Sequence, residues 1–263
     1  MTIDVITIFP RMVEAALAEG VIGRARERGV IDVRARDLRD FTTDRHRTVD
    51  DVPYGGGPGM VMKPEPIFGA VEAIAAERGA PSAIVQMTPQ GRRFTQAEAV
   101  RLSRLERIVV ICGRYEGVDE RVAEGLATDE LSIGDYVLTG GELPALVVID
   151  AVARLIPGVV GDAASVTGES FVRGRLDHPH YTRPAVFRGR AVPDVLVSGH
   201  HGEIERWRRR ERVRRTLERR PDLVGASELS DEERREVAAL DAERAAGREG
   251  AHVTTKERKH EGD

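Results

Sequence analysis

Short apolar runs alternate with helix-like segments through the first 157 residues, and this alternation is the feature that most constrains the fold. Runs typical of buried strands lie near Ile3–Phe9, Ile31–Arg36, Ala83–Met87, Ile108–Cys112 and Leu131–Leu138. Helical patterns lie near Met12–Arg28, Glu65–Glu77, Thr95–Leu105, Glu120–Leu126 and Pro144–Leu155. Strands that alternate with helices favour an α/β domain with a mainly parallel sheet.

Three predicted strands end in distinctive turns: Thr88–Gly91, Gly113–Gly117 and the segment SIGDYVLTGGELP, from Ser132 to Pro144. Ligands of open parallel sheets bind outside the carboxyl ends of the strands, so we expect these loops to line one crevice. The pair Gly140 and Gly141 lets a ligand approach the backbone closely. Apolar side chains interleaved with backbone polar groups suit a flat heterocycle, so the segment is a candidate cofactor pocket.

Arginine is concentrated in the last third of the chain. The chain has a net charge of −4, yet the stretch from Arg173 to Arg220 holds 14 Arg and 6 acidic residues. Such asymmetry favours contact with a polyanion such as a nucleic acid. The alternative is a solvated helix in which Glu and Arg pair one turn apart.

Several functional classes lack their sequence signatures. Neither GxxxxGK[ST] nor a GxGxxG that opens a helix after the first strand is present, which argues against common nucleotide-binding sites. No apolar run approaches ~20 residues, so we expect no membrane span and a cytoplasmic protein. Cys112 is predicted to be a core residue, and HPH and HH lack zinc-site geometry, so no metal ligands are predicted.

Three further features each allow a structural and a functional interpretation. The glycine-rich YGGGPGM, from Tyr54 to Met60, is either a wall that a base can approach or an ordinary surface loop. The turn GRYEG offers a cation, a stacking ring and an acceptor, or only a turn with a surface ion pair. Arg154 ends an apolar helix, where an Arg ordinarily satisfies the terminal carbonyls. Asp150, one turn earlier, is placed to hold the Arg154 side chain.

The composition changes after Pro157. Small, polar residues to Gly174 are typical of a linker, and an Arg-rich helix follows them. A last helix is predicted near Asp231–Ala246, opened by Ser230 with Glu233 at capping-box spacing. The second domain is therefore predicted to be small and helical, with a disordered charged tail from Gly247.

Taken together, YGGGPGM, GRYEGVDERV, ELSIGDYVLTGGELPALVVIDAVARLIPGVVG and LDHPHYTRP resemble the bacterial tRNA (guanine-N1)-methyltransferases of the TrmD family, nearly end to end. The resemblance implies a SPOUT α/β fold with a deep trefoil knot over residues 1–160. It further implies a flexible linker over 161–175, a helical tRNA-binding domain over 176–246 and a disordered tail over 247–263. The implied enzyme is a homodimer with active sites at its interface.

The resemblance implies transfer of a methyl group from S-adenosylmethionine to N1 of guanosine 37 in tRNA, next to the anticodon. It assigns to the cofactor Pro89, Gly113, Gly117, Ser132, Ile133, Gly134, Asp135, Tyr136, Val137, Leu138, Gly140, Gly141 and Pro144. It assigns to the guanine or tRNA Gly59, Glu116, Ser165, Asp177 and Arg183, with Glu116 also near the cofactor's amino end. A divalent cation such as Mg²⁺ is a further expected cofactor, with no ligands visible in the sequence.

The implied chemistry needs a base for the N1 proton and a cation for charge growing on O6. The family uses a post-knot Arg as the cation, which assigns Arg154 to catalysis in place of a cap. The family's acidic-Asp-Ser-Phe run reads Gly168-Glu169-Ser170-Phe171 here, so Glu169 is the candidate base and Asp177 its rival. Asp177 is otherwise interpreted as facing tRNA or an interface.

Two other functions remain as alternatives. A SPOUT methyltransferase can act on another RNA position, for instance a ribose, which would require neither a linker carboxylate nor Arg154. An RNA-binding protein that has lost catalysis is the alternative that Glu169 keeps open, and it would not bind S-adenosylmethionine.

Overall fold

The computed structural model describes residues 1–161, 168–172, 174–226 and 229–242, and the chain divides into two compact units, Met1–Val166 and Thr167–Asp263. Ser165 and most of the predicted linker's first half, 162–167, lie outside the described residues, as do residue 173 and the tail expected at 247–263.

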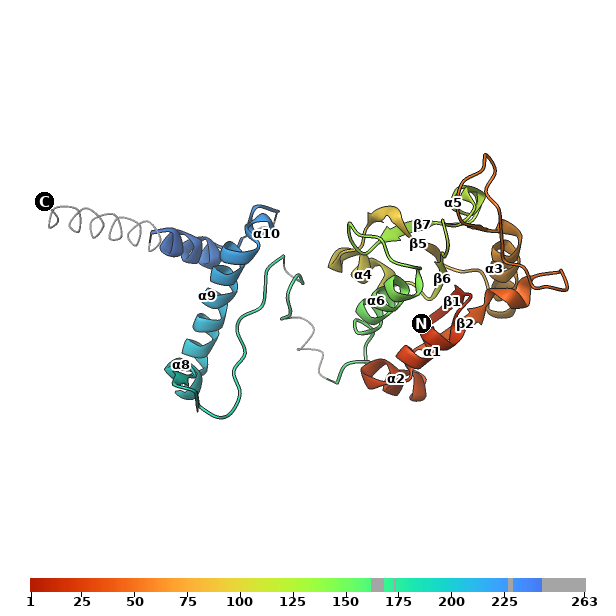
Figure 1. Cartoon of the computed structure of the whole chain (residues 1–263). Helices are drawn as coiled ribbons and strands as arrows, with labels where there is room; N and C mark the ends of the chain where they lie inside the picture. Colours follow the sequence, from red (N-terminus) through yellow and green to blue (C-terminus); the bar gives the residue numbers. More distant parts are fainter. Residues whose placement is uncertain (162–167, 173, 227–228, 243–263) are drawn as a thin grey trace, which may run out of the picture. The chain divides into compact units, whose positions relative to one another are not determined.

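A five-stranded parallel sheet forms the centre of the first unit (Figure 1). Its strands are β1 (Thr2–Thr7), β2 (Asp32–Asp37), β5 (Ala83–Arg93), β6 (Arg107–Cys112) and β7 (Asp129–Ser132). The order is β2-β1-β6-β5-β7, and every neighbouring pair is parallel. The mixed α/β fold with a mainly parallel sheet is therefore confirmed. A short antiparallel pair, β3 (Asp50–Asp51) and β4 (Val61–Met62), lies outside the sheet.

Helices cover both faces of the sheet because successive strand residues point to opposite faces. In β6, Ile108, Val110 and Cys112 join one apolar cluster, whereas Val109 and Ile111 join another. The first cluster includes residues of α1 (Pro10–Leu17), α2 (Gly20–Glu27), α4 (Gln96–Ser103) and α6 (Glu142–Ala153). The second includes residues of η1 (Leu38–Phe41), α3 (Pro64–Arg78) and α5 (Glu120–Gly125). Cys112 is fully buried, and burial raises the pKa of its thiol, which confirms its assignment to the core.

Three predicted elements differ from the observed ones. The single helix expected over Met12–Arg28 is two helices, because the backbone turns at Gly20, where φ is +68°. The strand expected over Leu131–Leu138 stops at Ser132, whose hydroxyl accepts a hydrogen bond from the Gly134 N–H at 3.2 Å. Strand β5 instead runs past its expected end, and both Met87 and Arg92 pair with Leu131. The segment Thr88–Gly91 therefore bulges within β5 and does not end it.

The described part of the second unit is mainly helical. It contains α8 (Asp194–Val197), α9 (His201–Arg219), α10 (Pro221–Ala226) and helical residues 231–242, with a hairpin of β8 (Val186–Phe187) and β9 (Arg190–Ala191). The predicted capping box is confirmed: the Ser230 N–H donates to Glu233 at 2.8 Å, and the Glu233 N–H donates to the Ser230 hydroxyl at 3.3 Å. Among described residues no helix is long and apolar enough to cross a membrane.

Candidate active site

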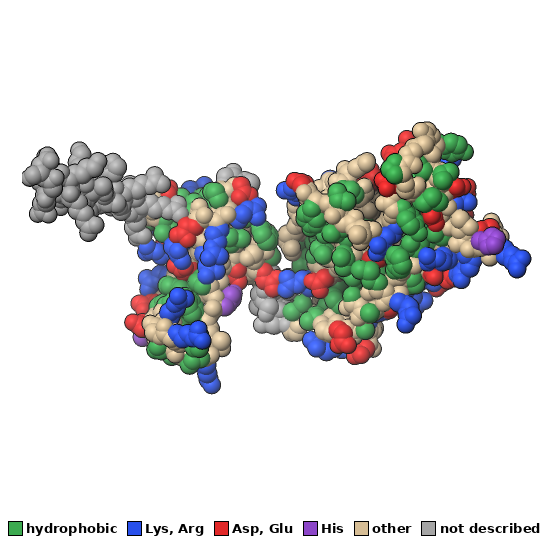
Figure 2. All heavy atoms as spheres, viewed as in Figure 1, with side chains coloured by type: hydrophobic (Ala, Val, Ile, Leu, Met, Phe, Trp, Pro, Cys, Tyr) green, Lys and Arg blue, Asp and Glu red, His purple; other side chains and the backbone are tan. Residues whose placement is uncertain are grey.

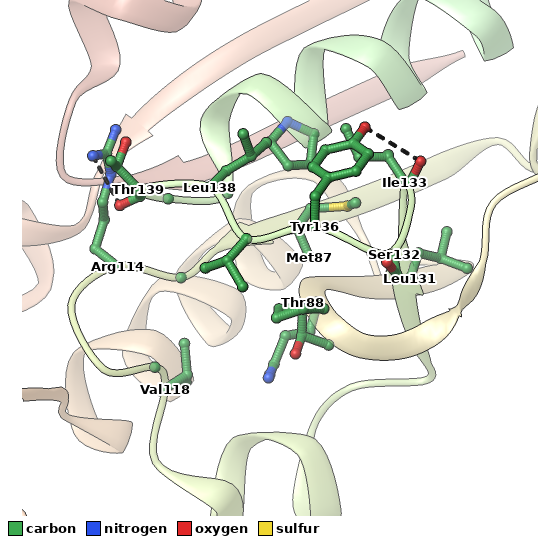
Figure 3. A pocket seen from close by; sticks show the side chains of 18 of the residues that line it. Met87, Thr88, Arg114, Val118, Leu131, Ser132, Ile133, Tyr136, Leu138 and Thr139 are labelled. Carbon is green, nitrogen blue, oxygen red and sulfur yellow. Dashed lines mark hydrogen bonds between the residues drawn. The ribbon is translucent and has the colours of Figure 1, made fainter.

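One pocket lies at the bulge of β5 and at the carboxyl ends of β6 and β7 (Figure 3). It confirms that the three predicted segments meet in one crevice: the loops after β6 and β7, and the bulge within β5 through Thr88 and Pro89. Of the residues predicted to bind a cofactor, those that line it are Pro89, Gly113, Gly117, Ser132, Ile133, Gly134, Tyr136, Val137, Leu138, Gly140, Gly141 and Pro144. Their role in binding stays a prediction.

Asp135 is the one predicted cofactor residue that does not line the pocket. Its side chain is 87% exposed and forms an ion pair with Arg93 at the end of β5. The adjacent Tyr136 does line the pocket, with its hydroxyl 3.5 Å from the Ile133 carbonyl (Figure 3). A β-carbon on Gly134 would lie 2.5 Å from the Tyr136 ring, so this glycine lets the ring fold back over the loop.

The glycine pair before α6 is required for the protein's own packing. A β-carbon on Gly141 would lie 2.7 Å from the Cys112 Cα, and one on Gly140 would overlap the Arg114 side chain. The Gly141 N–H also donates to the Gly113 carbonyl at 2.8 Å. The sequence interpretation attributed these glycines to close approach of a ligand, whereas the observed close approach is between the two loops.

The turn GRYEG contains an internal ion pair, whereas its structural interpretation expected one at the surface. The Arg114 Nε donates to the buried carboxylate of Glu142 at 2.8 Å, so this cation serves an internal ion pair. Tyr115 has φ of +62° and is half exposed, so its ring is available for stacking. Glu116 lines the pocket, and its N–H donates to the Met60 carbonyl at 3.0 Å, which joins the turn to the glycine-rich segment.

Gly59 of that segment lies directly against Glu116. A β-carbon on Gly59, where φ is +82°, would lie 2.5 Å from the Glu116 Oε1. YGGGPGM is thus a wall beside the pocket at Gly59, whereas Tyr54 at its other end is fully exposed. Two residues assigned to the substrate by resemblance are therefore adjacent.

The candidate catalytic residues belong to different units. Arg154 caps the carboxyl end of α6, and its N–H donates to the Asp150 carbonyl at 3.2 Å. Glu169 lines a cavity within the second unit with Arg175, Arg209 and Arg212.

Asp177 accepts three hydrogen bonds within the second unit. Burial opposes its charged form, but bonds from the His180 ring at 2.9 Å, the His178 N–H at 2.7 Å and Arg212 at 3.2 Å outweigh it and lower the pKa of Asp177. A carboxylate held in this way is a weak base. Arg183, the other predicted substrate residue of this unit, is exposed before β8.

The structure brings together a group of ligand-type side chains in the HPH region, which the sequence interpretation had rejected as a metal site. Ligand atoms of Asp177, His178 and His180 lie within 4.8 Å of one another. The run DHPH was the available signal, and the missing information was that the side chains of its Asp and both His converge. Mg²⁺ prefers oxygen ligands, whereas two of these groups are imidazoles and Arg212 adds a positive charge beside Asp177. The group therefore fits Mg²⁺ poorly.

Arginine and acidic side chains are interspersed on the surface of the second unit (Figure 2), and α9 is rich in both. Arg206, Arg208 and Arg214 pair with glutamates one turn away, at Glu203, Glu205, Glu211 and Glu218. The Glu–Arg pairs within one helix, which were expected as the alternative to nucleic-acid contact, are thus present. It leaves the excess of arginines intact, since α9 has fewer acidic than basic residues.

The fold and the pocket define an α/β protein with a loop-lined pocket at one edge of a parallel sheet, the place where such sheets bind ligands. The sequence profile of the tRNA (Guanine-1)-methyltransferase TrmD family matches residues 1–226, and the chain belongs to this family.

Curated relatives agree with this assignment. A protein of Pelotomaculum thermopropionicum is 57% identical over 89% of this chain and 94% of its own length. Similar proteins of Dehalococcoides mccartyi strain CBDB1 and Geobacillus kaustophilus are 53% and 51% identical, over 94% and 93% of this chain and 99% and 100% of their own lengths. Each of the three is named tRNA (guanine-N(1)-)-methyltransferase.

Proposed function

We propose that the protein transfers a methyl group from S-adenosylmethionine to N1 of guanosine 37 in tRNA. The observation that carries this proposal is the pocket in which the bulge of β5 and the loops after β6 and β7 converge, in a chain of the TrmD family. The relatives' names supply the tRNA and guanine N1.

The pocket's chemistry fits S-adenosylmethionine. Apolar walls from Leu131, Ile133, Leu138 and Pro144 suit an adenine ring, and the loop backbone offers polar groups for its edge. Ser132 is largely buried, with its hydroxyl already bonded to the Gly134 backbone, so it shapes the loop. The bound cofactor would supply a sulfonium methyl group that needs no further activation.

Two side chains would manage the charges of the reaction. Glu169 takes the N1 proton, which leaves an electron pair on N1. Bound S-adenosylmethionine would supply the methyl group to that pair and keep the electrons of its carbon–sulfur bond. Arg154 stabilises negative charge that grows on O6 as the proton leaves. Glu116 and Gly59 hold the guanine beside the pocket. Glu169 is one methylene longer than the Asp of the family pattern, so the linker must seat it differently.

We propose the SPOUT knot, the linker over 161–175 and a tRNA-binding domain over 176–246 as the frame for this chemistry. The chain path supports the knot: after edge strand β7 it returns past β6, where Gly141 bonds Gly113, and reaches β1, where Glu142 bonds Thr7. The exposed side chains of Met12, Leu143 and Val147, on the contacting helices α1 and α6, support a homodimer with active sites at its interface.

The tRNA is proposed to bind the arginine-rich second unit, with Asp177 and Arg183 near it. The target base must leave its stack to reach the pocket. Because the group at Asp177, His178 and His180 fits Mg²⁺ poorly, no step is assigned to a metal. A cytoplasmic location is proposed with the tRNA substrate.

The test is methylation of an anticodon stem-loop in which the target guanosine is replaced by inosine or adenosine. Inosine keeps N1–H and O6, so the proposal expects methylated inosine and unmodified adenosine, as measured by nucleoside mass. Methylation of a ribose, or equal methylation of adenosine, would contradict it. A separate titration that detects no binding of S-adenosylmethionine would favour an RNA-binding protein without catalysis.

A further inference from the structure

Glu142 is a buried carboxylate beside the pocket but outside its lining. It lies in the first turn of α6 with no exposed surface. Its Oε1 accepts the Thr7 hydroxyl at 2.7 Å, and its Oε2 accepts the Arg114 Nε at 2.8 Å. A buried charge is costly unless it is paired and hydrogen-bonded, and here both oxygens are engaged. Glu142 therefore finds its partners inside the protein, away from the surface of the pocket.

Its partner Arg114 joins the two loops that form one wall of the pocket (Figure 3). Besides its bond to Glu142, the Arg114 Nη1 donates to the Thr139 carbonyl at 3.1 Å. The Arg114 backbone also forms a β-bridge with Gly140. The guanidinium lies 4.6 Å from the centre of the Phe9 ring, so the side chain is held from both sides.

Thr7 anchors this arrangement to the sheet. It ends β1, is fully buried, and its hydroxyl accepts the Phe9 N–H at 2.9 Å while donating to Glu142. Thr7 itself does not line the pocket. A continuous set of hydrogen bonds thus runs from the end of β1 through Glu142 and Arg114 to the pocket loop at Thr139.

We propose that Glu142 is a positioning residue, which fixes Arg114 and through it the wall formed by Gly113–Gly117 and Thr139–Gly141. This inference rests on the proposed function, because it takes S-adenosylmethionine as the pocket's ligand. A loop pair fixed before binding loses less conformational freedom when the ligand binds. Loss of the Glu142 charge is therefore expected to weaken cofactor binding more than it slows the chemical step.

Asp4 offers a matched control for a role in stability alone. It lies in the same strand as Thr7, its side chain is 3% exposed, and it accepts hydrogen bonds from Arg36 at 2.7 Å and Arg78 at 3.4 Å. It does not line the pocket. Asp4→Asn thus disturbs a buried carboxylate with two arginine partners, without touching the wall.

The experiment uses the full chain and calorimetric titration with S-adenosylmethionine, beside Tm, KM and kcat. We expect Glu142→Gln to raise the cofactor Kd and KM by about tenfold or more, with kcat at saturating cofactor within about threefold of wild type. Asp4→Asn is expected to lower Tm and leave the cofactor Kd within about twofold, since its site is separate.

Thr7→Val and Thr7→Ser form a second pair that does not depend on folding of Glu142→Gln. Thr7→Val removes the hydroxyl that holds Glu142 and is expected to raise the cofactor Kd. Thr7→Ser keeps a hydroxyl and is expected to leave the cofactor Kd close to that of wild type. An unchanged cofactor Kd in both Glu142→Gln and Thr7→Val would overturn this inference but not the proposed function. An equal rise of the cofactor Kd in Asp4→Asn would do the same. Failure of the wild-type chain to bind S-adenosylmethionine would overturn the proposed function and this inference with it.

Discussion

The carboxylate of Glu116 occupies the space that a side chain on Gly59 would need. A β-carbon on Gly59 would lie 2.5 Å from Oε1 and 2.6 Å from Cγ of Glu116. Because Glu116 lines the pocket, the glycine sets where this carboxylate can lie.

Gly59→Ala is expected to displace Glu116 and lower kcat/KM for tRNA by about 10²-fold, the cost of a displacement near 1 Å at a reacting site. Gly55→Ala is the control, because Gly55 has nearly the same φ, +83° against +82°, but open space around it. Steady-state kinetics and Tm of both variants separate backbone strain from displacement of Glu116. Equal losses in the two variants would contradict a specific role for the contact.

Glu169→Gln is expected to reduce methyl transfer by about 10²- to 10⁴-fold, the usual contribution of a general base, and to leave cofactor affinity unchanged. Asp177→Asn is expected to retain transfer, since Asp177 is engaged by His178, His180 and Arg212 and its pKa is lowered. Single-turnover rates provide the measurement. Full activity in Glu169→Gln together with an inactive Asp177→Asn would reassign the base to Asp177.

Gly141→Ala is expected to destabilise the first unit by about 1–3 kcal/mol, as overpacking does, and to abolish cofactor binding. Its β-carbon would meet the backbone of Cys112 and Gly113, which cannot move aside as a flexible side chain can. Gly202→Ala in α9 has open space and serves as the control, with an expected gain of up to about 1 kcal/mol from helix propensity. Denaturant unfolding with and without S-adenosylmethionine tests both variants.

Asp129 is expected to contribute to acid sensitivity. Burial opposes its charge, but bonds from Arg92, Thr128 and Arg101 prevail and lower the pKa of Asp129. Its contribution to stability is therefore present above the unfolded pKa, about 3.9, and is lost as pH falls through the lower folded value. Asp129→Asn should flatten the fall of Tm with pH below about 4. A Tm profile parallel to wild type would contradict this.

Arg206 and Arg208 test the nucleic-acid surface, because the structure pairs each of them only weakly, with one exposed glutamate three residues earlier. Replacing both by Ser is expected to weaken tRNA binding and to reduce the slope of log K against log salt by about 2, one per lost phosphate contact. Binding of S-adenosylmethionine should not change. An unaltered salt slope would remove these two arginines from the interface.

The alternation of apolar runs and helices predicted the parallel sheet because strands buried on both faces read as continuous apolar segments. It failed where one side chain or one backbone angle ends an element. Gly20 splits a pattern that is periodic throughout, and the Ser132 hydroxyl ends a strand whose apolar residues continue to Leu138. The ends of these elements depend on local backbone geometry, about which the apolar periodicity carries no information.

The candidate site was predictable as three loops at one edge of the sheet, and the resemblance supplied its residue roles. The connection from Thr7 to Glu142 was not predictable, because its residues are 135 positions apart in sequence. The reason for glycine at positions 140 and 141 was not predictable either. A side chain there would overlap Arg114 and Cys112, which come from another part of the chain.

Helix α6 begins directly after the glycine pair and ends directly before Arg154. Each residue of an α-helix turns the chain by about 100° and advances it by about 1.5 Å, so inserting or deleting one residue within α6 would swing Arg154 to another side of the helix. The stretch from Gly141 to Arg154 should therefore accept exchanges of apolar side chains but no change in length. Among relatives of this protein, insertions are expected in the loop around Tyr54, which is exposed, and not in this helix.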